Sequence, residues 1–423
     1  MNKKVSKPKI CLKGELTIPS DKSVAHRAVI FSSLAKGTSV IKNFSKGQDP
    51  LSSLEICKKL GILAEFKDNL YITSSGKLNT SKTDLYCGNS GTTMRLMAGI
   101  LAGQNFNSIL TGDESLSKRP MKRIITPLSL MGAKINSNNE KAPLKIVGQS
   151  LHGINYSSPI ASAQVKSSIL LAGLFADNKT TVTEPYLSRN HTELMLSYMD
   201  ADISINGLSV TVAKSELTPK VIEIPGDISS AAYFIAAALI VPDSEIILKN
   251  VGLNPTRTGL LDVLKKMGAD IEILDKQTIS NELTGDLRIK YSDLTGCIIE
   301  GDIIPRLIDE IPVLAVVATQ AQGQTVIKDA QDLRNKESDR IKTIVAELKK
   351  LGASIEETPD GMIINGKINL QGGVEAETYH DHRLAMSLYV AGLVCKKEIL
   401  IKDFDWVNIS MPEFDELFSH LLT

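Results

Sequence analysis

The chain has 423 residues, of which 43% are hydrophobic and 23% charged, with 48 lysines plus arginines against 48 aspartates plus glutamates. This composition is typical of a globular protein of two or three domains, and the balanced charge argues against a nucleic-acid or membrane-surface partner. Five scattered cysteines without a CxxC pair favour neither a disulfide framework nor a zinc site. The N-terminus has no apolar signal segment, which predicts a cytoplasmic protein.

The basic residues divide unevenly into 37 lysines and 11 arginines. A chain that uses lysine so freely is expected to keep arginine where its planar fork is needed to grip a carboxylate or a phosphate. The arginines therefore mark candidate anion-binding positions. They are Arg27, Arg95, Arg119, Arg123, Arg189, Arg257, Arg288, Arg306, Arg334, Arg340 and Arg383.

One α/β pattern recurs six times along the chain. A helix rich in small residues runs into a short apolar strand, and residues 42, 111, 184, 249, 328 and 402 mark equivalent points about 72 residues apart. Between these points, five helices close on a glycine or an aspartate and lead into another strand, as in "LKKMGADIEI". Six such units predict two α/β domains of three units each, divided near Pro225 and Gly226.

The stretch "PSDKSVAHRAVIF" (19–31) predicts a helix that Ser20 or Asp21 caps. Lys22 and Arg27 fall in its first two turns, where the dipole and free amides of a helix disfavour cations. Positive charge gathered there suits an anion-binding site. On this motif alone, a solvated amphipathic helix is the favoured interpretation.

Two polar stretches follow in the next repeat. "LYCGNSGTTMRLMAG" (85–99) predicts a glycine-rich turn opening a helix, either a substrate loop around Asn89 and Gly91 or a plain strand-to-helix turn. "GDESLSKRPMKRIITPL" (112–128) gathers four cations, among them Arg119, around Pro120, which is expected at the first position of the following helix. A solvated basic face is the alternative for this second stretch.

Polar residues also precede two strongly apolar helices. In "SAQVKSSILLAGL" (162–174), Ser162 and Gln164 are interpreted as capping residues. In "IPRLIDEIPVLAVVA" (304–318), Asp309 and Glu310 interrupt an apolar run. Burial would raise the pKa of a carboxylate there and suit it to proton transfer, whereas a satisfied helix cap is the alternative.

The last two charged stretches are "DLRNKESDRIKTI" (332–344) and "TYHDHRLAMSLYVAGL" (378–393). The first places Lys336 and Arg340 around Glu337 on one predicted helix face, as a binding site or as an exposed salt-bridge ladder. In the second, the HxH pattern lacks a third metal ligand, so we expect no metal there and interpret Asp381 as a helix cap.

Taken in this order, the motifs resemble those of the 5-enolpyruvylshikimate-3-phosphate synthase (3-phosphoshikimate 1-carboxyvinyltransferase) family over essentially the whole chain. The resemblance implies an inside-out α/β barrel fold of two domains, each with three βαβαββ units and with the substrates between them. Residues 20–225 would form the first domain, and residues 1–19 plus 226–423 the second.

The resemblance also implies the reaction. The enolpyruvyl group of phosphoenolpyruvate would pass to the 5-hydroxyl of shikimate 3-phosphate, with release of phosphate, in the shikimate pathway to chorismate and the aromatic amino acids. No metal or organic cofactor is implied, and the lack of a distinct apolar stripe predicts a monomer. Ile409 stands where some members carry a lysine that contacts phosphoenolpyruvate, a position that bears on inhibition by glyphosate.

Site residues follow from the same resemblance, position by position. The implied ligands of shikimate 3-phosphate are Lys22, Ser23, Arg27, Ser162, Gln164, Ser188, Asp309 and Lys336. The implied ligands of phosphoenolpyruvate are Lys22, Gly91, Arg119, Gln164, Arg340 and Arg383. Among the catalytic residues, which include Lys22, Asp309 is implied as the base for the 5-hydroxyl and Glu337 as the acid that protonates the methylene carbon.

Two other functions stay open on the same scaffold. UDP-N-acetylglucosamine enolpyruvyl transferase has asparagine after its active-site lysine and a cysteine-bearing loop, whereas Ser23 follows Lys22 here and no cysteine lies in a comparable glycine-rich loop. A non-catalytic phosphometabolite-binding protein would not need both Asp309 and Glu337. Both alternatives are therefore less favoured than the synthase.

Overall fold

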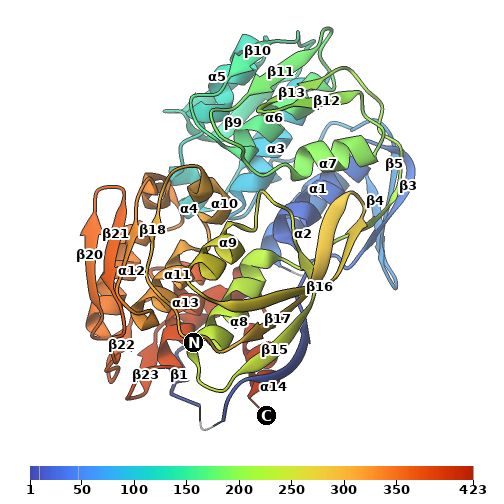
Figure 1. The fold of residues 1–423 in the computed structure, drawn as a ribbon. Helices are drawn as coiled ribbons and strands as arrows, with labels where there is room; N and C mark the ends of the chain where they lie inside the picture. The colour runs from blue at the N-terminus through green and yellow to red at the C-terminus, as the bar shows by residue number, and fades with distance from the viewer. Residues whose placement is uncertain (9, 46, 423) are drawn as a thin grey trace. The chain divides into compact units, whose positions relative to one another are not determined.

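The computed structural model describes residues 1–8, 10–45 and 47–422. The chain divides into two compact units: unit 1 holds residues 1–21, 226–278 and 283–423, and unit 2 holds residues 22–225 and 279–282. Over the described residues each unit contains three small sheets (Figure 1). No helix in the described ranges combines the length and apolarity that a membrane crossing requires.

The middle sheet of unit 2 shows the repeating unit most plainly. Its strands lie in the order β6-β7-β9-β8, with β6 parallel to β7 and the other pairs antiparallel. A parallel pair needs a crossover, and a helix, α3, supplies it. The elements are β6 (Leu85–Tyr86), α3 (Gly91–Ala102), β7 (Ser108–Thr111), α4 (Glu114–Lys118), α5 (Lys122–Leu130), β8 (Lys134–Asn138) and β9 (Lys141–Val147).

The other two sheets of unit 2 keep this order, as β10-β11-β13-β12 and β14-β3-β5-β4. One consists of β10 (Asn155–Ser157), α6 (Ala163–Gly173), β11 (Thr180–Thr183), α7 (His191–Tyr198), β12 (Ile203–Asn206) and β13 (Ser209–Val212). The other consists of α1 (Lys22–Ser32), β3 (Lys36–Lys42), α2 (Gln48–Lys59), β4 (Leu63–Phe66), β5 (Leu70–Ser75) and β14 (Val221–Glu223). Because β14 pairs in parallel with β3, the last strand of the unit completes its first repeat.

Unit 1 closes in a similar way through the N-terminal strands. β2 pairs in parallel with β15, and β1 pairs with β23 near the other end of the chain, as the blue and red strands of Figure 1 show. The first repeat holds β2 (Lys13–Thr17), α8 (Ile228–Ile240), β15 (Glu245–Gly252), α9 (Gly259–Lys266), β16 (Asp270–Ile279) and β17 (Glu282–Lys290).

The two later repeats of unit 1 follow in sequence. One holds β18 (Ile298–Ile299), the 3-10 helix η1 (Gly301–Ile303), α10 (Ile304–Leu307), α11 (Ile311–Gln320), β19 (Gln324–Ile327), the 3-10 helix η2 (Gln331–Asn335), α12 (Arg340–Lys350), β20 (Ser354–Thr358) and β21 (Gly361–Asn365). The last holds β1 (Lys3–Val5), β22 (Glu375–Ala376), α13 (His382–Gly392), β23 (Ile399–Ile401), the 3-10 helix η3 (Phe404–Ile409) and α14 (Phe414–Leu421).

The predicted six-fold repeat is confirmed. The strands β3, β7, β11, β15, β19 and β23 reach or directly precede the six marker positions. The residues predicted to close the five helices all have left-handed backbone conformations, where a side chain is disfavoured. Their φ angles are 91° at Gly61, 96° at Gly132, 65° at Asp200, 98° at Gly268 and 95° at Gly352.

Buried helices form the centre of each core, and the sheets have a solvent-facing side. All thirteen residues of α8 are buried, whereas β9 alternates exposed and buried residues. A helix that is apolar all round must be covered on every side, and alternation marks a sheet with one wet face. In unit 2 the approach is close, since a Cβ on Gly99 of α3 would lie 2.1 Å from the Ser168 carbonyl oxygen of α6.

Two local predictions are wrong. Pro120 does not begin a helix, because α5 starts at Lys122 with Met121 at its cap position. Arg119 before it is extended, the conformation that a following proline imposes. Lys336 and Arg340 do not share a helix face, because α12 starts at Arg340, where Asp339 caps it by accepting a hydrogen bond from the Lys342 amide.

Candidate active site

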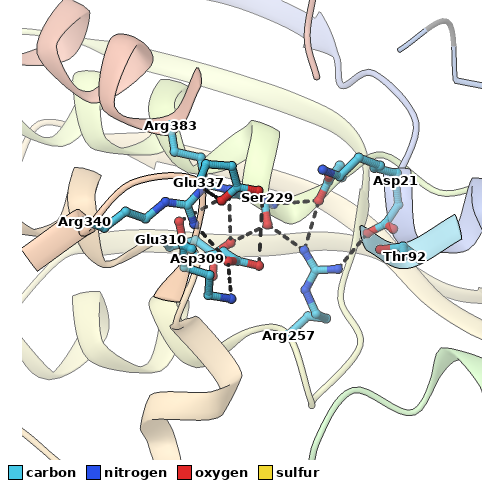
Figure 2. Close-up of polar contacts among 12 residues, drawn as sticks. Asp21, Thr92, Ser229, Arg257, Asp309, Glu310, Glu337, Arg340 and Arg383 are labelled. Atoms are coloured by element: carbon cyan, nitrogen blue, oxygen red, sulfur yellow. Dashed lines mark hydrogen bonds and ion pairs between the residues drawn. The ribbon is translucent and has the colours of Figure 1, made fainter. Parts of the chain in front are cut away.

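In unit 1 the predicted charged residues gather at the N-terminal ends of helices, where Figure 2 shows their side chains directed toward one another. Asp309 and Glu310 lie between α10 and α11, and Glu337 lies just before α12. Arg340 and Arg383 are the first residue of α12 and the second of α13. Among the described residues, no three His, Cys, Asp or Glu side chains are grouped as a metal ion would require.

Three cations surround the carboxylate of Asp309. Its Oδ1 lies 3.3 Å from both Lys336 Nζ and Arg340 Nη1, and its Oδ2 lies 3.9 Å from Arg383 Nη2. The side chain is 11% exposed, so these charges act across little water. They favour the ionised carboxylate, which can accept a proton. The capping alternative does not apply to Asp309, because Glu310 occupies the cap position of α11.

Arg340 is held by three carboxylates, those of Asp309, Glu337 and Asp381. Its Nε and Nη2 lie 2.8 and 3.3 Å from the two oxygens of Asp381, and Nη2 also lies 2.6 Å from Glu337 Oε2. With 2% exposure, Arg340 does not belong to an exposed salt-bridge ladder, so that alternative is wrong. Asp381 caps α13 as predicted, through the Arg383 amide at 2.9 Å. Burial tends to raise the pKa of Asp381, but the charge of Arg340 lowers it below its ordinary value.

A second network adjoins this cluster and was missed in the sequence analysis. Arg257 lies 3.1 Å from both Asp21 and Asp227 and donates to Ser229 Oγ at 2.6 Å. Ser229 in turn donates to Glu310, whose Oε1 lies 3.7 Å from Arg383 Nη1. Burial and the charge of Asp21 raise the pKa of Asp227 above its ordinary value. The scarcity of arginine was the available signal, since Arg257 is one of the eleven.

In unit 2, α1 is not a solvated helix, because its residues 24–32 are all buried. Lys22 at its start is partly exposed and pairs with Asp49 at 3.1 Å. Arg27 is 2% exposed, and its guanidinium donates to Thr192 Oγ1 at 2.7 Å and Ser167 Oγ at 3.0 Å. Arg27 thus links α1 to α6 and α7 by hydrogen bonds. Its Nη1 also donates to the carbonyl oxygen of Ser23.

The glycine-rich turn opens α3 as predicted, with Ser90 capping it through the Thr93 amide. A Cβ on Gly91 would lie 2.7 Å from Arg95 Nη1 and 3.5 Å from Arg119 Nη1, so two guanidinium groups face this backbone position. Gly91 therefore leaves room beside the backbone for the Arg95 guanidinium.

Side chains from other segments hold these two arginines in place. Arg119 donates to Asn89 Oδ1 at 2.6 Å, and Arg95 donates to Gln164 Oε1 at 2.6 Å. Gln164 itself donates to Thr92 Oγ1 at 2.9 Å. The structure thus brings Gly91, Arg119 and Gln164 together within unit 2, and it adds Arg95, which was not among the predicted ligands.

The last two predicted residues meet at a carboxylate. Glu184 accepts hydrogen bonds from the Ser162 amide at 2.9 Å and from the Ser188 hydroxyl at 2.8 Å. Ser162 stands at the cap position of α6, but its hydroxyl makes no cap hydrogen bond. The capping interpretation of Ser162 is therefore wrong for its side chain.

Comparison with known proteins identifies the family. Residues 7–418 match the family description of EPSP synthase (3-phosphoshikimate 1-carboxyvinyltransferase). The chain belongs to the EPSP synthase family. It is 54% identical over 419 residues to the 3-phosphoshikimate 1-carboxyvinyltransferase of Thermoanaerobacter sp. (strain X514), covering 98% of this chain and 99% of the relative. It is 51% identical over 416 residues to that of Bacillus subtilis (strain 168), covering 97% and 96%.

Solved structures of the EPSP synthase family have the same fold. The structure of EPSP synthase from Acinetobacter baumannii superimposes with a TM-score of 0.90 at 42% identity, over 99% of this chain and 98% of that one. The predicted family and the α/β fold class are confirmed, and the chain is an enzyme.

Proposed function

We propose that the chain transfers the enolpyruvyl group of phosphoenolpyruvate to the 5-hydroxyl of shikimate 3-phosphate and releases phosphate, a step toward chorismate and the aromatic amino acids. One observation carries this proposal: membership of the EPSP synthase family over residues 7–418. The charged cluster of unit 1, with carboxylates beside Arg340, Arg383 and Lys336, fits the proton transfers that the reaction needs.

The reaction is an addition followed by an elimination. The 5-oxygen forms a bond to C2 of phosphoenolpyruvate while C3 takes up a proton, and phosphate then leaves C2 as a proton leaves C3. The first step needs a base for the hydroxyl and an acid for the methylene carbon. We propose Asp309 as the base, since its three cations favour the ionised form, and Glu337 as the acid.

Phosphoenolpyruvate carries a carboxylate and a phosphate, and arginine forks bind both groups well. The proposed ligands are Lys22, Gly91, Arg119, Gln164, Arg340 and Arg383. All but Arg119, which follows the last residue of α4, lie in the first turn of a helix. This placement supports the assignment, because free amides there also attract anions. Of these side chains, Arg340 and Arg383 are almost fully buried, with side-chain exposures of 2% and 9%. In such surroundings water screens an ion pair only weakly.

The proposed ligands of shikimate 3-phosphate are Lys22, Ser23, Arg27, Ser162, Gln164, Ser188, Asp309 and Lys336. Asp309 and Lys336 would bind the ring hydroxyls, and the ion pair between them at 3.3 Å supports a shared role. We also propose that the enzyme acts as a cytoplasmic monomer without a metal or an organic cofactor.

Phosphate release from phosphoenolpyruvate tests the proposal. The purified chain is assayed alone, with shikimate 3-phosphate, and with UDP-N-acetylglucosamine in its place. We expect release only with shikimate 3-phosphate. Release that requires UDP-N-acetylglucosamine would reassign the substrate. Binding of shikimate 3-phosphate without release under any condition would instead indicate a non-catalytic protein.

A further inference from the structure

Unit 2 contains a buried ion cluster that the proposed reaction does not use directly. The ammonium group of Lys166 lies 2.7 Å from Glu184 Oε2 and 2.6 Å from Glu193 Oε1. Side-chain exposures are 1% for Lys166, 3% for Glu184 and 1% for Glu193. These residues, hereafter the Lys166 cluster, come from α6, from the residue after β11, and from α7 (Figure 1).

The two glutamates of the cluster differ in what else they bind. Glu184 Oε1 accepts from the Ser162 amide at 2.9 Å, and Oε2 accepts from the hydroxyl and the amide of Ser188 at 2.8 and 3.4 Å. In contrast, Glu193 Oε2 is buried and has no hydrogen-bond partner among the described residues. Only Glu184 therefore connects the cluster to Ser162 and Ser188.

A buried carboxylate is stable only when it is paired and hydrogen-bonded, so its donors are held firmly. Lys166 supplies the opposite charge for Glu184, and the two serines supply three of its donors. Ser162 lies just before α6 and Ser188 before α7, in segments that belong to no strand. Glu184 is thus the common hydrogen-bond partner of two loop residues that the proposed function makes ligands of shikimate 3-phosphate.

We infer that Glu184 is a positioning residue for the phosphate group of shikimate 3-phosphate. Paired with Lys166, it holds the segments that carry Ser162 and Ser188 at the spacing that the phosphate requires. Glu184 does not itself bind the phosphate, because two anions repel each other. This inference rests on the proposed function, since it assumes that the two serines are ligands of shikimate 3-phosphate.

Two matched variants test the inference, Glu184→Gln and Glu193→Gln. Each removes one carboxylate from the same cluster and leaves the side chain nearly the same size. In Glu184→Gln, the four donors that face the carboxylate are left with one acceptor oxygen, and the new amide group is a further donor. We expect the KM for shikimate 3-phosphate to rise roughly tenfold or more, as for loss of hydrogen bonds to a charged group.

Glu193→Gln is expected to leave that KM little changed, because Glu193 contacts neither serine in the described structure. In both variants the KM for phosphoenolpyruvate and kcat should stay close to those of the wild type. The thermal midpoint should fall in both, since both disturb the pairing of Lys166. The contrast between the two KM values therefore separates a positioning role from a purely structural one.

A third variant covers the outcome in which Glu184→Gln does not fold. Glu184→Asp keeps the charge opposite Lys166 but shortens the side chain by one methylene group, so the serine bonds lengthen. We expect it to fold and still to raise the KM for shikimate 3-phosphate. A wild-type KM in Glu184→Asp would overturn the inference, as would equal increases in the two glutamine variants or an equal rise in both substrates' KM values.

The wild-type protein distinguishes this failure from failure of the proposed function. If the wild type shows no phosphate release that depends on shikimate 3-phosphate, the proposed function is wrong and the inference falls with it. If the wild type is active but the Glu184 variants bind shikimate 3-phosphate as well as Glu193→Gln does, by calorimetric titration, the inference alone is wrong.

Discussion

The guanidinium of Arg340 donates to the carboxylate of Glu337 at 2.6 Å, across the start of α12. A carboxylate in such a contact is held in its ionised form. This contact places the Glu337 carboxylate beside a guanidinium that the proposed function assigns to phosphoenolpyruvate. In the proposed mechanism, an anionic substrate bound to Arg340 would compete with Glu337 for this guanidinium, which would couple substrate binding to the acid step.

The first prediction concerns Glu337→Gln. Glutamine can still accept a hydrogen bond from Arg340 but has no carboxyl proton to transfer. We expect phosphate release to fall by at least about 100-fold, as for loss of a general acid, with binding of shikimate 3-phosphate retained. Steady-state phosphate release and calorimetric titration measure the two quantities.

Asp339→Asn is the matched control for this variant. Asp339 lies two residues along the chain, caps α12 through the Lys342 amide and pairs with Arg334. Asparagine caps helices equally well, so activity should be nearly that of the wild type. A similar loss in both variants would assign the effect to the start of α12 rather than to the acid.

The second prediction is an opposite pH dependence of stability at two buried aspartates. The pKa of Asp381 is lowered, because the charge of Arg340 outweighs burial. The Asp381 carboxyl therefore binds a proton more tightly in the unfolded chain than in the folded one. The stabilisation is present above the unfolded pKa near 4 and is lost as the pH falls below it. Asp381→Asn should lose roughly 3–5 kcal/mol at neutral pH, as for a broken buried ion pair, and less below pH 4.

Asp227 should behave in the opposite sense. Burial and Asp21 raise its pKa, so the folded chain binds the proton more tightly and the wild type loses stability as the pH rises above about 4. Asp227→Asn keeps an acceptor for the Ser229 amide that caps α8. Its stability relative to the wild type should therefore increase from pH 4 to pH 7. Thermal midpoints of the wild type and the two variants, measured from pH 4 to pH 7, test this prediction. It would be wrong if the difference in midpoint from the wild type changed with pH in the same direction for both variants.

The third prediction concerns Gly91→Ala. The new methyl group would lie 2.7 Å from Arg95 Nη1, so that guanidinium must move. We expect the KM for phosphoenolpyruvate to rise roughly tenfold, equivalent to about 1.4 kcal/mol of lost binding. Because alanine favours a helix by roughly 0.5–1 kcal/mol over glycine, the thermal midpoint should not fall. A lower midpoint with unchanged KM would show that Gly91 serves folding only.

The fourth prediction compares the two serines at Glu184. The Ser188 hydroxyl donates its one proton to Glu184, whereas the Ser162 hydroxyl has no hydrogen-bond partner within the described chain and can donate to a phosphate. Ser162→Ala should therefore raise the KM for shikimate 3-phosphate more than Ser188→Ala does. The reverse order would mean that the Ser188 hydroxyl turns from Glu184 to the substrate.

The repeat and most helix boundaries could be predicted because their signals are local. A glycine or aspartate at the end of a helix adopts a left-handed conformation whatever surrounds it, as at Gly268 and Asp200. The wrong helix start predicted at Pro120 also has a local cause. Arg119 before it is extended, so α4 ends there and α5 begins only at Lys122. Asp309 was marked by a local signal too, since carboxylates interrupt an apolar run there, and Gly91 by a glycine-rich turn before a helix.

The charge partners could not be predicted in this way. Arg257 was visible as a scarce arginine, but its bonds to Asp21 and Asp227 span 236 and 30 residues. The sequence left open whether Arg340 and Glu337 form a binding site or an exposed salt-bridge ladder, and only the structure showed that Arg340 is buried. The Coulomb energy of a charge pair depends on the distance between the charges and on how much water surrounds them. The spacing of residues along the chain gives neither quantity.

By itself, the sequence determined the α/β class, the six-fold repeat and most of the helix starts near which candidate residues lie, because hydrophobic period and capping act over a few residues. Only the tertiary structure decided which charges meet. Asp309 acquires its cations from Lys336, 27 residues away, and from Arg383, whose Nη1 also donates to the Asp309 carbonyl oxygen, 74 residues away. Packing of the buried helices brings these segments together. It places the Asp309 carboxylate close to these cations, where little water reaches it.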